Sequence, residues 1–388
     1  MKQLGLVLTI VFATTVMASV TLDSTAVYAG QGQRSNAADD PKPLPLEENR
    51  TFRLETDEAS WISLDVSPDG EWIVFDVLGD LYLLPFSGGE AQRITWGMEF
   101  DSQPRFSPDG RLVLFISDEQ GGENLHILDL DEQNEEGEYE IRALTKGRNN
   151  SYSSPEWVPG GEYVIATKSF GRRGKLWMWH VDGGSGIQLI DEPAAVKTIG
   201  AAFGPDDRYI WFARRSGDWE YNAIFPQYQI FYYDRETGEQ VTRTSRYGSA
   251  MRPTLSPDGK WLAYATRFET ETGLRLRDLK TGDERWLMYP VQRDDQEAMA
   301  TRDAFPGMSF TPDSAEVVTT YDGKIWRVPI DGSEPSMVPF HVEADFAYGP
   351  EVFFEYPVSD DPTFVITQVR DAVPSPDGTK LAFVGLDH

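Results

Sequence analysis

The sequence predicts an all-β protein, a β-propeller made of four-stranded blades. Three observations lead to this prediction. A turn tetrapeptide, Ser-Pro-Asp-Gly, returns along the chain, and a short run of β-branched and aromatic residues follows each copy. The units between copies contain no 12-residue stretch with the 3.6-residue periodicity of a helix. Helical solenoids, the competing class of repeat protein, are therefore excluded.

The spacing of the tetrapeptide gives the length of each repeat. It has four true copies, beginning at Ser67, Ser107, Ser256 and Ser375, and three degenerate copies, beginning at Val158, Gly204 and Thr311. The seven prolines are Pro68, Pro108, Pro159, Pro205, Pro257, Pro312 and Pro376, at intervals of 40 to 64 residues. Seven marks delimit six full repeats and open a seventh, and this spacing is typical of propeller blades.

Each repeat has the same internal order, which the first one illustrates. An alternating stretch at 62–66 precedes the turn, and the runs 71–77, 80–86 and 91–95 follow it. Proline at the second turn position restricts φ, and glycine at the fourth accepts positive φ. Four short strands per unit make one blade, and radial packing protects their edges.

The C-terminal repeat is incomplete. It has two strand runs, Val369–Pro374 and Lys380–Gly385, so the prediction is six complete blades plus a partial seventh. The run Thr51–Thr56 resembles the fourth-strand ends of other repeats, such as Ile141–Thr145. We therefore expect Thr51–Thr56 to pair with the partial seventh blade as its outer strand.

The N-terminal region predicts export. Lys2 precedes an uncharged apolar run, Leu4–Val20, and small-residue cleavage patterns end at Ala18 and Ala29. This layout indicates a signal peptide over 1–29; a membrane anchor is the alternative, because the run is about as long as the shortest spanning helices. Residues 30–50 are polar and read as a flexible linker, so the propeller is expected over 51–388 in a periplasmic or secreted protein.

Charge and cysteine content exclude several classes of function. The chain of 388 residues has 35 Lys+Arg against 63 Asp+Glu, a formal net charge of −28. Proteins that bind nucleic acid or anionic membranes gain affinity from surplus basic residues, so neither is an expected partner. The chain has no cysteine. Disulfides, thiolate metal sites and cysteine nucleophiles are therefore excluded.

The combination of repeats resembles a known family. Each repeat resembles the Pro-Asp propeller repeat of TolB-like proteins, over about 51–388. Its order is a strand, the Ser-Pro-Asp-Gly turn, two strands, a glycine turn and a last strand that ends in Leu-Thr. The segment 353–388 is similar to a stretch in exported bacterial amidohydrolases, which carry such repeats ahead of a metal-dependent hydrolase domain. The resemblance implies the N-terminal propeller portion of such a protein, ending before the hydrolase domain.

Catalytic constellations are missing from the sequence. An amidohydrolase metal centre needs several histidines, usually opened by a His-x-His pair, and the four histidines (His126, His180, His341 and His388) are not spaced in this way. The nearest approach to a Gly-x-Ser-x-Gly elbow, residues 183–187, lacks the last glycine. We therefore expect no catalytic residue, metal or cofactor in this chain.

Candidate binding residues lie in the longer connections. In a propeller, the loops from strand two to strand three and the connections between blades gather on one face. The long ones are Ser117–Asn124, Lys168–Lys175, Arg214–Gln227, Lys146–Asn150 and Pro290–Arg302. They hold the candidate site residues Arg148, Arg172, Arg173, Trp219 and Tyr221, with Arg246 nearby. The arginines would form a positive group that recruits an acidic ligand or a peptide carboxylate; alternatively, they pair with neighbouring acids.

Three functions remain open at this stage. The first is a non-catalytic propeller module that gates or docks substrate for a downstream amidohydrolase domain. The second is a free-standing periplasmic protein of TolB type that binds a protein or peptide. The third, a propeller enzyme with its site in the channel, has little support in the sequence. Fold analogy does not specify the ligand.

Overall fold

The computed structural model describes residues 48–386, except 136, 171–172, 193–196, 216–223, 299 and 350–360. Within these ranges the regular structure is all strand. The expected signal peptide, 1–29, and residues 30–47 of the expected linker lie outside the described residues. No helix long and apolar enough to cross a membrane occurs in the part of the chain that is described.

Along the described part of the chain, six four-stranded antiparallel sheets follow one another, and each is one blade. Blades one and two consist of β2 (Leu64–Val66), β3 (Trp72–Val77), β4 (Asp80–Pro85) and β6 (Gln92–Arg93), then β7 (Ser102–Phe106), β8 (Leu112–Ser117), β9 (Asn124–Gln133) and β10 (Tyr139–Ala143). Blades three and four consist of β11 (Ser151–Trp157), β12 (Tyr163–Phe170), β13 (Arg173–His180) and β14 (Gly183–Gln188), then β15 (Thr198–Ala202), β16 (Tyr209–Arg215), β17 (Tyr228–Asp234) and β18 (Gln240–Thr242). Blades five and six consist of β19 (Met251–Leu255), β20 (Trp261–Phe268), β21 (Glu271–Asp278) and β22 (Glu284–Met288), then β23 (Ser309–Phe310), β24 (Glu316–Tyr321), β25 (Lys324–Pro329) and β26 (Ser336–Val338).

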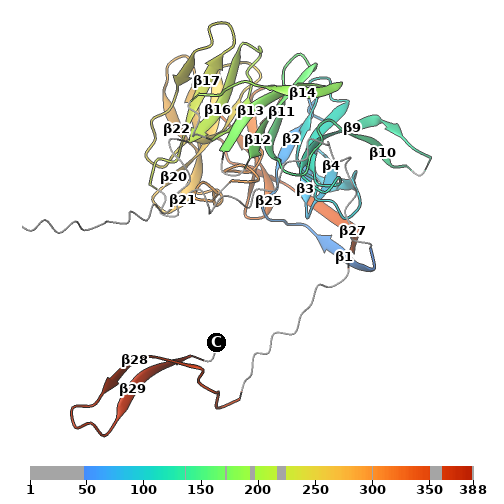
Figure 1. Ribbon diagram of the computed structural model, residues 1–388. Coiled ribbons are helices and arrows are strands. Elements are labelled where there is room, and N and C mark those ends of the chain that lie inside the picture. The colour runs from blue at the N-terminus through green and yellow to red at the C-terminus, as the bar shows by residue number, and fades with distance from the viewer. Residues whose placement is uncertain are drawn as a thin grey trace, which may run out of the picture. The chain divides into compact units, whose positions relative to one another are not determined.

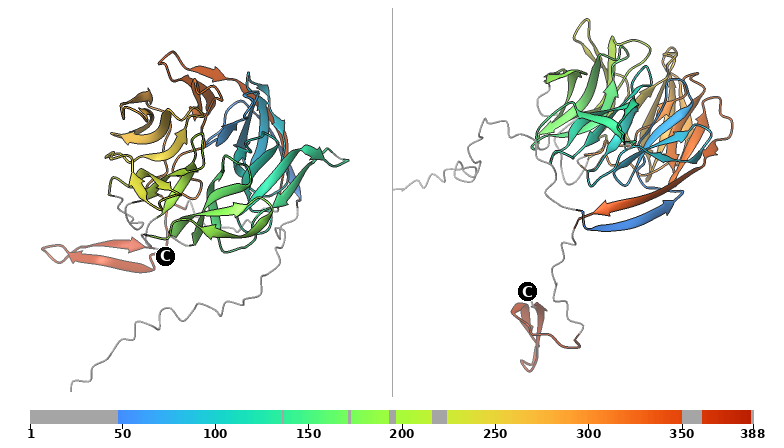
Figure 2. Two further views of the ribbon diagram at one scale, coloured as in Figure 1. Left: turned by 90° about the horizontal axis from the view of Figure 1, so that it is seen from above. Right: turned by 90° about the vertical axis from the view of Figure 1, so that its right-hand side faces the viewer.

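The six sheets are arranged around a common axis (Figures 1 and 2). The first strand of each blade contacts the first strand of the next, so these strands surround the axis. Apolar side chains fill the spaces between neighbouring blades. Between blades one and two, for example, Val74 and Leu81 pack with Val113 and Phe115, all 0% exposed. Burying one such side chain stabilises the fold by about 1.5–3 kcal/mol. The predicted all-β propeller is confirmed.

The Ser-Pro-Asp-Gly turns share one hydrogen-bond pattern. In blade two, Ser107 Oγ donates to Asp109 Oδ1 (2.5 Å), and it accepts a hydrogen bond from the backbone N–H of Leu112 (2.8 Å). The Asp109 carboxylate also accepts from the backbone N–H of Arg111 (3.2 Å). The serine hydroxyl lowers the pKa of Asp109. The tetrapeptide is therefore a self-contained turn that starts each second strand.

The first strands of blades two to five carry a common irregularity. Their pairing with the second strand shifts register, and the residue five positions before the repeat proline has a positive φ. These residues are Gln103, Ser154, Gly200 and Arg252, with φ between 51° and 68°. The shift is a β-bulge, which bends the strand and redirects its side chains. In three of the four, the bulge residue has a polar side chain that bonds to another blade or blade connection: Gln103 to Ser154 N, and Ser154 and Arg252 to Asp303.

The ring closes between blade six and blade one. Thr320 Oγ1 donates to Ile62 O (3.3 Å), and Leu64 N donates to Gly307 O (3.2 Å). Each turn glycine also faces the repeat proline of the preceding blade. A β-carbon at Gly110 would lie 3.5 Å from Pro68, and one at Gly70 would lie 3.5 Å from Pro312. Blade one therefore contacts blade six through the same glycine–proline contact by which blade two contacts blade one, and the propeller closes with six blades.

The strand that follows blade six attaches to blade one. β27 (Phe340–Tyr348) pairs in parallel with the short β5 (Gly89–Glu90), and the Phe340 ring packs against Phe75, with centroids 5.3 Å apart. The other neighbour of β27 is β1 (Arg50–Thr56). The prediction that Thr51–Thr56 forms the outer strand of a seventh blade is therefore wrong. β27 presents a free edge directly after the closed ring, and β1 pairs with it instead.

The C-terminal repeat is a two-stranded hairpin, β28 (Gln368–Pro374) and β29 (Leu381–Leu386). It matches the two strand runs predicted there, and it carries both local signatures of a blade. Asp371 has a φ of 53° at a register shift, and Ser375 Oγ donates to Asp377 Oδ1 (2.5 Å). The hairpin belongs to a second compact unit, 46–54 with 345–388, while the ring lies within 55–344. The range 51–388 expected for the propeller thus spans two units.

Candidate binding site on the loop face

Strand direction divides the connections of the ring between two faces. The Ser-Pro-Asp-Gly turns lie on one face, and the loops from strand two to strand three lie on the other, with the blade connections. We name the second one the loop face. A pocket lies on this face, on blade three.

The pocket is built on a long hairpin. β12 and β13 pair without interruption from Tyr163↔His180 to Phe170↔Arg173. Most of the segment Lys168–Lys175, expected to be a loop, is therefore strand, because the two strands continue together past the end of the blade. Directly paired residues share one face of a sheet. Lys168, Phe170, Arg173, Lys175 and Trp177 consequently line the same side of the hairpin.

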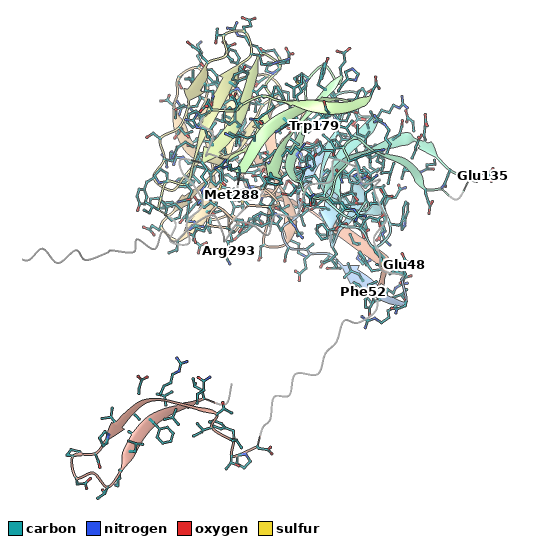
Figure 3. All side chains as sticks on the ribbon, in the orientation of Figure 1. Glu48, Phe52, Glu135, Trp179, Met288 and Arg293 are labelled. Atoms are coloured by element: carbon teal, nitrogen blue, oxygen red, sulfur yellow. The ribbon has the colours of Figure 1, made fainter. Side chains whose placement is uncertain are left out.

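The pocket has a volume of about 440 Å³, within the range of small-ligand sites. Among the described residues, eight line it: Asn150, Lys168, Phe170, Arg173, Lys175, Trp177, Gln188 and Asp191. Three of these side chains are cationic and one is a carboxylate, so the pocket is positive within a chain whose net charge is −28. The Trp177 and Trp179 rings of β13 are stacked, with centroids 6.1 Å apart. Figure 3 labels Trp179 on this strand.

The two lysines of the pocket differ in their partners, and the charges of Glu192 and Asp191 favour the charged form of Lys175 alone. Lys168 Nζ lies over the Trp177 ring, 4.5 Å from its centroid, and makes no hydrogen bond or ion pair with any described residue. Lys175 Nζ donates to the backbone carbonyl of Asp191 (3.3 Å). Burial lowers the pKa of both lysines. An anion in the pocket would stabilise their charged forms, because an opposite charge offsets desolvation.

The predicted arginines do not form one group. Arg173 lines the pocket, and Arg148 is exposed two residues before the lining residue Asn150, in the connection between blades two and three. Arg246 does not line the pocket; its Nη1 is 3.6 Å from Glu284 Oε2 of blade five. Arg172, Trp219 and Tyr221 lie outside the described residues.

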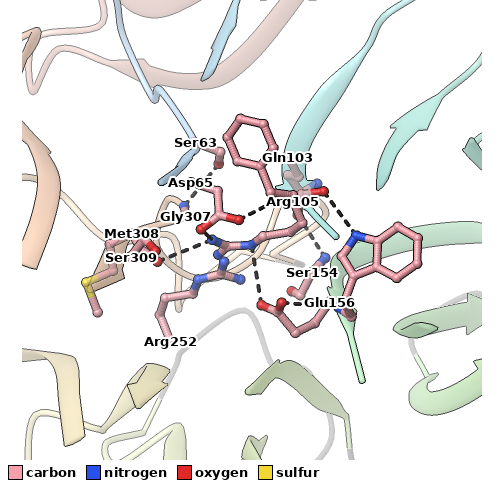
Figure 4. A network of polar contacts seen from close by, with 12 residues as sticks. Ser63, Asp65, Gln103, Arg105, Ser154, Glu156, Arg252, Gly307, Met308 and Ser309 are labelled. Atoms are coloured by element: carbon pink, nitrogen blue, oxygen red, sulfur yellow. Dashed lines mark hydrogen bonds and ion pairs between the residues drawn. The ribbon is translucent and has the colours of Figure 1, made fainter. Parts of the chain in front are cut away.

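A network of polar contacts joins the blades at the channel of the propeller (Figure 4). Arg105, 5% exposed, donates through Nη1 to Leu64 O (3.1 Å), Asp65 Oδ1 (3.2 Å) and Met308 O (3.3 Å). Its Nε is 3.4 Å from Glu156 Oε2. Burial raises the pKa of Glu156 to about 7, and Arg105 opposes this rise. Arg105 thus ties blades one, two and three to the segment that leads into blade six.

The connection Pro290–Arg302, expected to be a binding loop, is instead packed inward with the residues that follow it. Asp303 bonds to Ser154 of blade three and to Arg252 of blade five, where the Arg252 Nη1 to Asp303 Oδ2 distance is 2.8 Å. Ala300 O accepts from Lys197 Nζ (3.1 Å), just before blade four. Gly307 N donates to Ser63 Oγ (3.1 Å) of blade one. A single segment that reaches these blades has to cross the axis, so it occupies the channel on the loop face.

Lys168, Phe170, Lys175 and Trp177 were not singled out as site residues from the sequence. A signal for them was available. Lys168 and Phe170 alternate along one strand, Arg173, Lys175 and Trp177 alternate along the next, and period-two alternation places each set on one face. The alternation was obscured because the segment between them reads as a glycine-rich loop.

No known protein-family profile matches the chain. Over 179 residues it is 30% identical to the "Uncharacterized peptidase YuxL" of Bacillus subtilis (strain 168), which covers 46% of the chain and 23% of that protein. Over 91 residues it is 31% identical to the "Tol-Pal system protein TolB" of Desulfosudis oleivorans (strain DSM 6200 / JCM 39069 / Hxd3), which covers 24% of the chain and 19% of that protein. The matched segments thus span about a fifth of the length of these curated relatives.

Two solved structures share the fold. TolB from Acinetobacter baumannii superposes with a TM-score of 0.54 at 19% identity, over 73% of this chain and 66% of that one. The tricorn protease superposes with a TM-score of 0.54 at 15% identity, over 85% of this chain and 30% of that one. The chain folds as a TolB-like β-propeller, with a positively charged pocket on its loop face.

Proposed function

We propose that the chain is a non-catalytic binding propeller whose loop face captures an acidic group on a protein or peptide partner. The observation that carries the proposal is the blade-three pocket, where Lys168, Arg173 and Lys175 stand beside the Phe170 and Trp177 side chains. Cations next to aromatic rings suit a carboxylate attached to an apolar or aromatic residue. We therefore infer that the bound group is a peptide carboxylate.

Two settings for this function are open. In the first, the propeller docks substrate for a catalytic domain of a larger amidohydrolase-like protein; its likeness to part of a peptidase and of the tricorn protease supports this setting. In the second, it binds its partner as an independent TolB-like protein, which the likeness to TolB proteins supports. In both, the protein is exported, because Leu4–Val20 has the layout of a signal peptide.

Fluorescence anisotropy with one labelled peptide tests the pocket. The probe ends in an aromatic residue with a free α-carboxylate, and the comparison peptide carries a C-terminal amide. We expect the carboxylate to bind at least about tenfold more tightly, since a charge-assisted hydrogen bond is roughly twice as strong as a neutral one. Affinity should fall as pH rises toward the lowered pKa of Lys168, because the neutral amine no longer attracts the anion.

A pair of charge-matched variants locates the binding. Lys168→Gln removes a cation from the pocket, whereas Lys260→Gln removes one from an exposed turn on the opposite face, where Lys260 Nζ is 2.9 Å from Asp258 Oδ2. The first should weaken carboxylate binding about tenfold, and the second should leave it unchanged. Equal affinities for the carboxylate and the amide, or equal effects of the two variants, would overturn the proposal for this pocket.

Two further measurements address catalysis and export. Mass spectrometry of the peptide after incubation should find it intact; cleavage products that increase with protein concentration would contradict a non-catalytic role.

N-terminal sequencing of the protein from its host should find a start near Ser19 or Gly30. A membrane-bound product that retains Met1 would support an anchor instead.

A further inference from the structure

Three arginines face a single carboxylate between blades four and five, and one of them also contacts the backbone of a fourth arginine. Arg277 Nη1 is 2.9 Å from Glu284 Oε1, Arg246 Nη1 is 3.6 Å from Glu284 Oε2, and Arg275 Nη2 is 3.9 Å from the same oxygen. Arg277 Nη1 also donates to the backbone carbonyl of Arg243 (3.1 Å). We call Arg243, Arg246, Arg275 and Arg277 the arginine cluster.

Strand pairing holds these side chains together. Arg275 pairs directly with Tyr264 on one side and Trp286 on the other, and Arg277 pairs with Glu284. Arg275 lies over the Trp286 ring, 4.7 Å from its centroid, and Arg243 lies near the Trp211 and Tyr232 rings, at 5.7 and 5.6 Å. The guanidinium groups of Arg275 and Arg243 are thus held beside aromatic rings, which preorganises these two.

The donors of the cluster are not saturated. The Nε atoms of Arg243, Arg275 and Arg277 are shielded from solvent and have no hydrogen-bond partner among the residues that the structure describes. Arg243 makes no ion pair with any described residue. A buried donor without a partner costs about 1–3 kcal/mol. The cluster therefore pays a desolvation cost that an additional acceptor would offset.

The charge of the cluster indicates the kind of acceptor. Four guanidinium groups and the Glu284 carboxylate sum to three positive charges in a chain with a net charge of −28. A carboxylate would leave two positive charges, whereas a phosphate dianion would leave one. Guanidinium forks also match phosphate oxygens in two-point hydrogen bonds. Arg246, with 32% of its side chain exposed, is the most accessible of the three arginines that face Glu284.

We propose that the arginine cluster is a binding site for a phosphoryl group, separate from the pocket on blade three. Isothermal titration calorimetry with inorganic phosphate tests this site directly. We expect one phosphate per chain, and at least about tenfold weaker binding of acetate, which carries a single charge. Equal binding of acetate, or no saturable phosphate binding, would overturn the proposal.

Three variants separate a binding role from a structural one. Arg246→Gln should weaken phosphate binding at least about tenfold. Arg285→Gln, which removes the same charge from the neighbouring residue of Glu284, should leave it unchanged. Glu284→Gln should tighten phosphate binding several-fold, since it removes the competing carboxylate. The proposal is overturned if Arg246→Gln leaves phosphate affinity unchanged, as Arg285→Gln does, or if Glu284→Gln weakens phosphate binding while the protein stays folded. Either result would mean that the cluster only stabilises the contact between blades four and five.

The source of the phosphoryl group can be read from a competition experiment. Tighter binding of a phosphoserine peptide than of inorganic phosphate assigns the group to a modified peptide, and the reverse order assigns it to a free ion. Both results support the site. Because Lys168→Gln leaves this cluster intact, failure of the proposed carboxylate pocket would not affect the outcome here.

Discussion

The closed ring and the C-terminal hairpin contain the same local structure in different surroundings. Phe75 of blade one and Phe383 of the hairpin both stand seven residues after the repeat proline, yet Phe75 is 0% exposed and Phe383 is 43% exposed. Turn and bulge form in both. The comparison teaches that the repeat sequence specifies the hairpin of a blade, while neighbouring blades supply most of its stability.

The largest difference is expected for the core aromatic. Phe75→Ala should lower the free energy of unfolding of the ring by about 3–5 kcal/mol, because it leaves a cavity beside Phe340 and Tyr82. Phe383→Ala should change it by less than about 0.5 kcal/mol, as an exposed position does. Chemical denaturation followed by circular dichroism measures both. A similar loss in the two variants would show that the hairpin is part of the ring's cooperative unit.

The next effect concerns a buried carboxylate of the ring. Asp76 accepts hydrogen bonds from Ser63 N (2.7 Å) and Gln103 N (2.9 Å), and burial raises its pKa to about 6. The folded state therefore holds a proton that the unfolded state releases near pH 4, so this contribution to stability is present below pH 4 and lost as pH rises through 6. The free energy of unfolding should fall by roughly 3 kcal/mol between pH 4 and 7 for this reason.

Asp76→Asn tests this pH dependence. The variant should flatten the fall in stability between pH 4 and 7, as measured by denaturation at a series of pH values. Asp377→Asn in the hairpin is the matched control, because hydrogen bonds from Ser375 and Thr379 lower the pKa of Asp377 to about 2 and the residue is exposed. An unchanged slope in Asp76→Asn would mean that other groups, such as Glu156, control it.

A turn glycine gives a smaller difference. Gly259 has a φ of +70°, and a β-carbon there would lie 3.0 Å from Pro205 of the preceding blade. Gly259→Ala should destabilise the ring by about 1–3 kcal/mol, the sum of backbone strain and crowding. Gly378 of the hairpin has the same φ but open space around it. Gly378→Ala should leave the melting temperature of the ring unchanged; a matching fall would contradict the role of contacts between blades.

The smallest effect is that of the turn hydroxyl. Ser107→Ala removes the hydrogen bonds to Asp109 and from Leu112 N, so the ring should lose about 1 kcal/mol. The pKa of Asp109 should rise toward its ordinary value, which NMR titration can follow. Ser375→Ala removes the same bonds in the hairpin and should leave the ring's stability as it was. No change in the pKa of Asp109 would show that the serine is not its main stabilising partner.

The candidate site was predictable only in part. The sequence identified the loop face and Arg173, because an inserted segment between two strands marks a connection of the propeller. The sequence did not show that Arg173 and Arg246 belong to different sites. Their distance depends on the positions, around the ring, of blade three and of the interface between blades four and five. Pro290–Arg302 also read as an exposed loop. Nothing in its composition signals that Asp303, just beyond it, would meet Ser154 and Arg252 at the axis.

By itself, the sequence determined the features that depend on neighbours along the chain. Proline, aspartate and glycine set the turns, the hydroxyl of the first turn residue orders them, and alternation predicts the strands. The tertiary structure alone decided that six blades close the ring, that β1 joins β27, and that the C-terminal repeat belongs to a second compact unit. The physical reason is that closure depends on contacts such as Gly70 with Pro312 and Thr320 with Ile62. These residues lie about 250 positions apart, so no local pattern records that they meet.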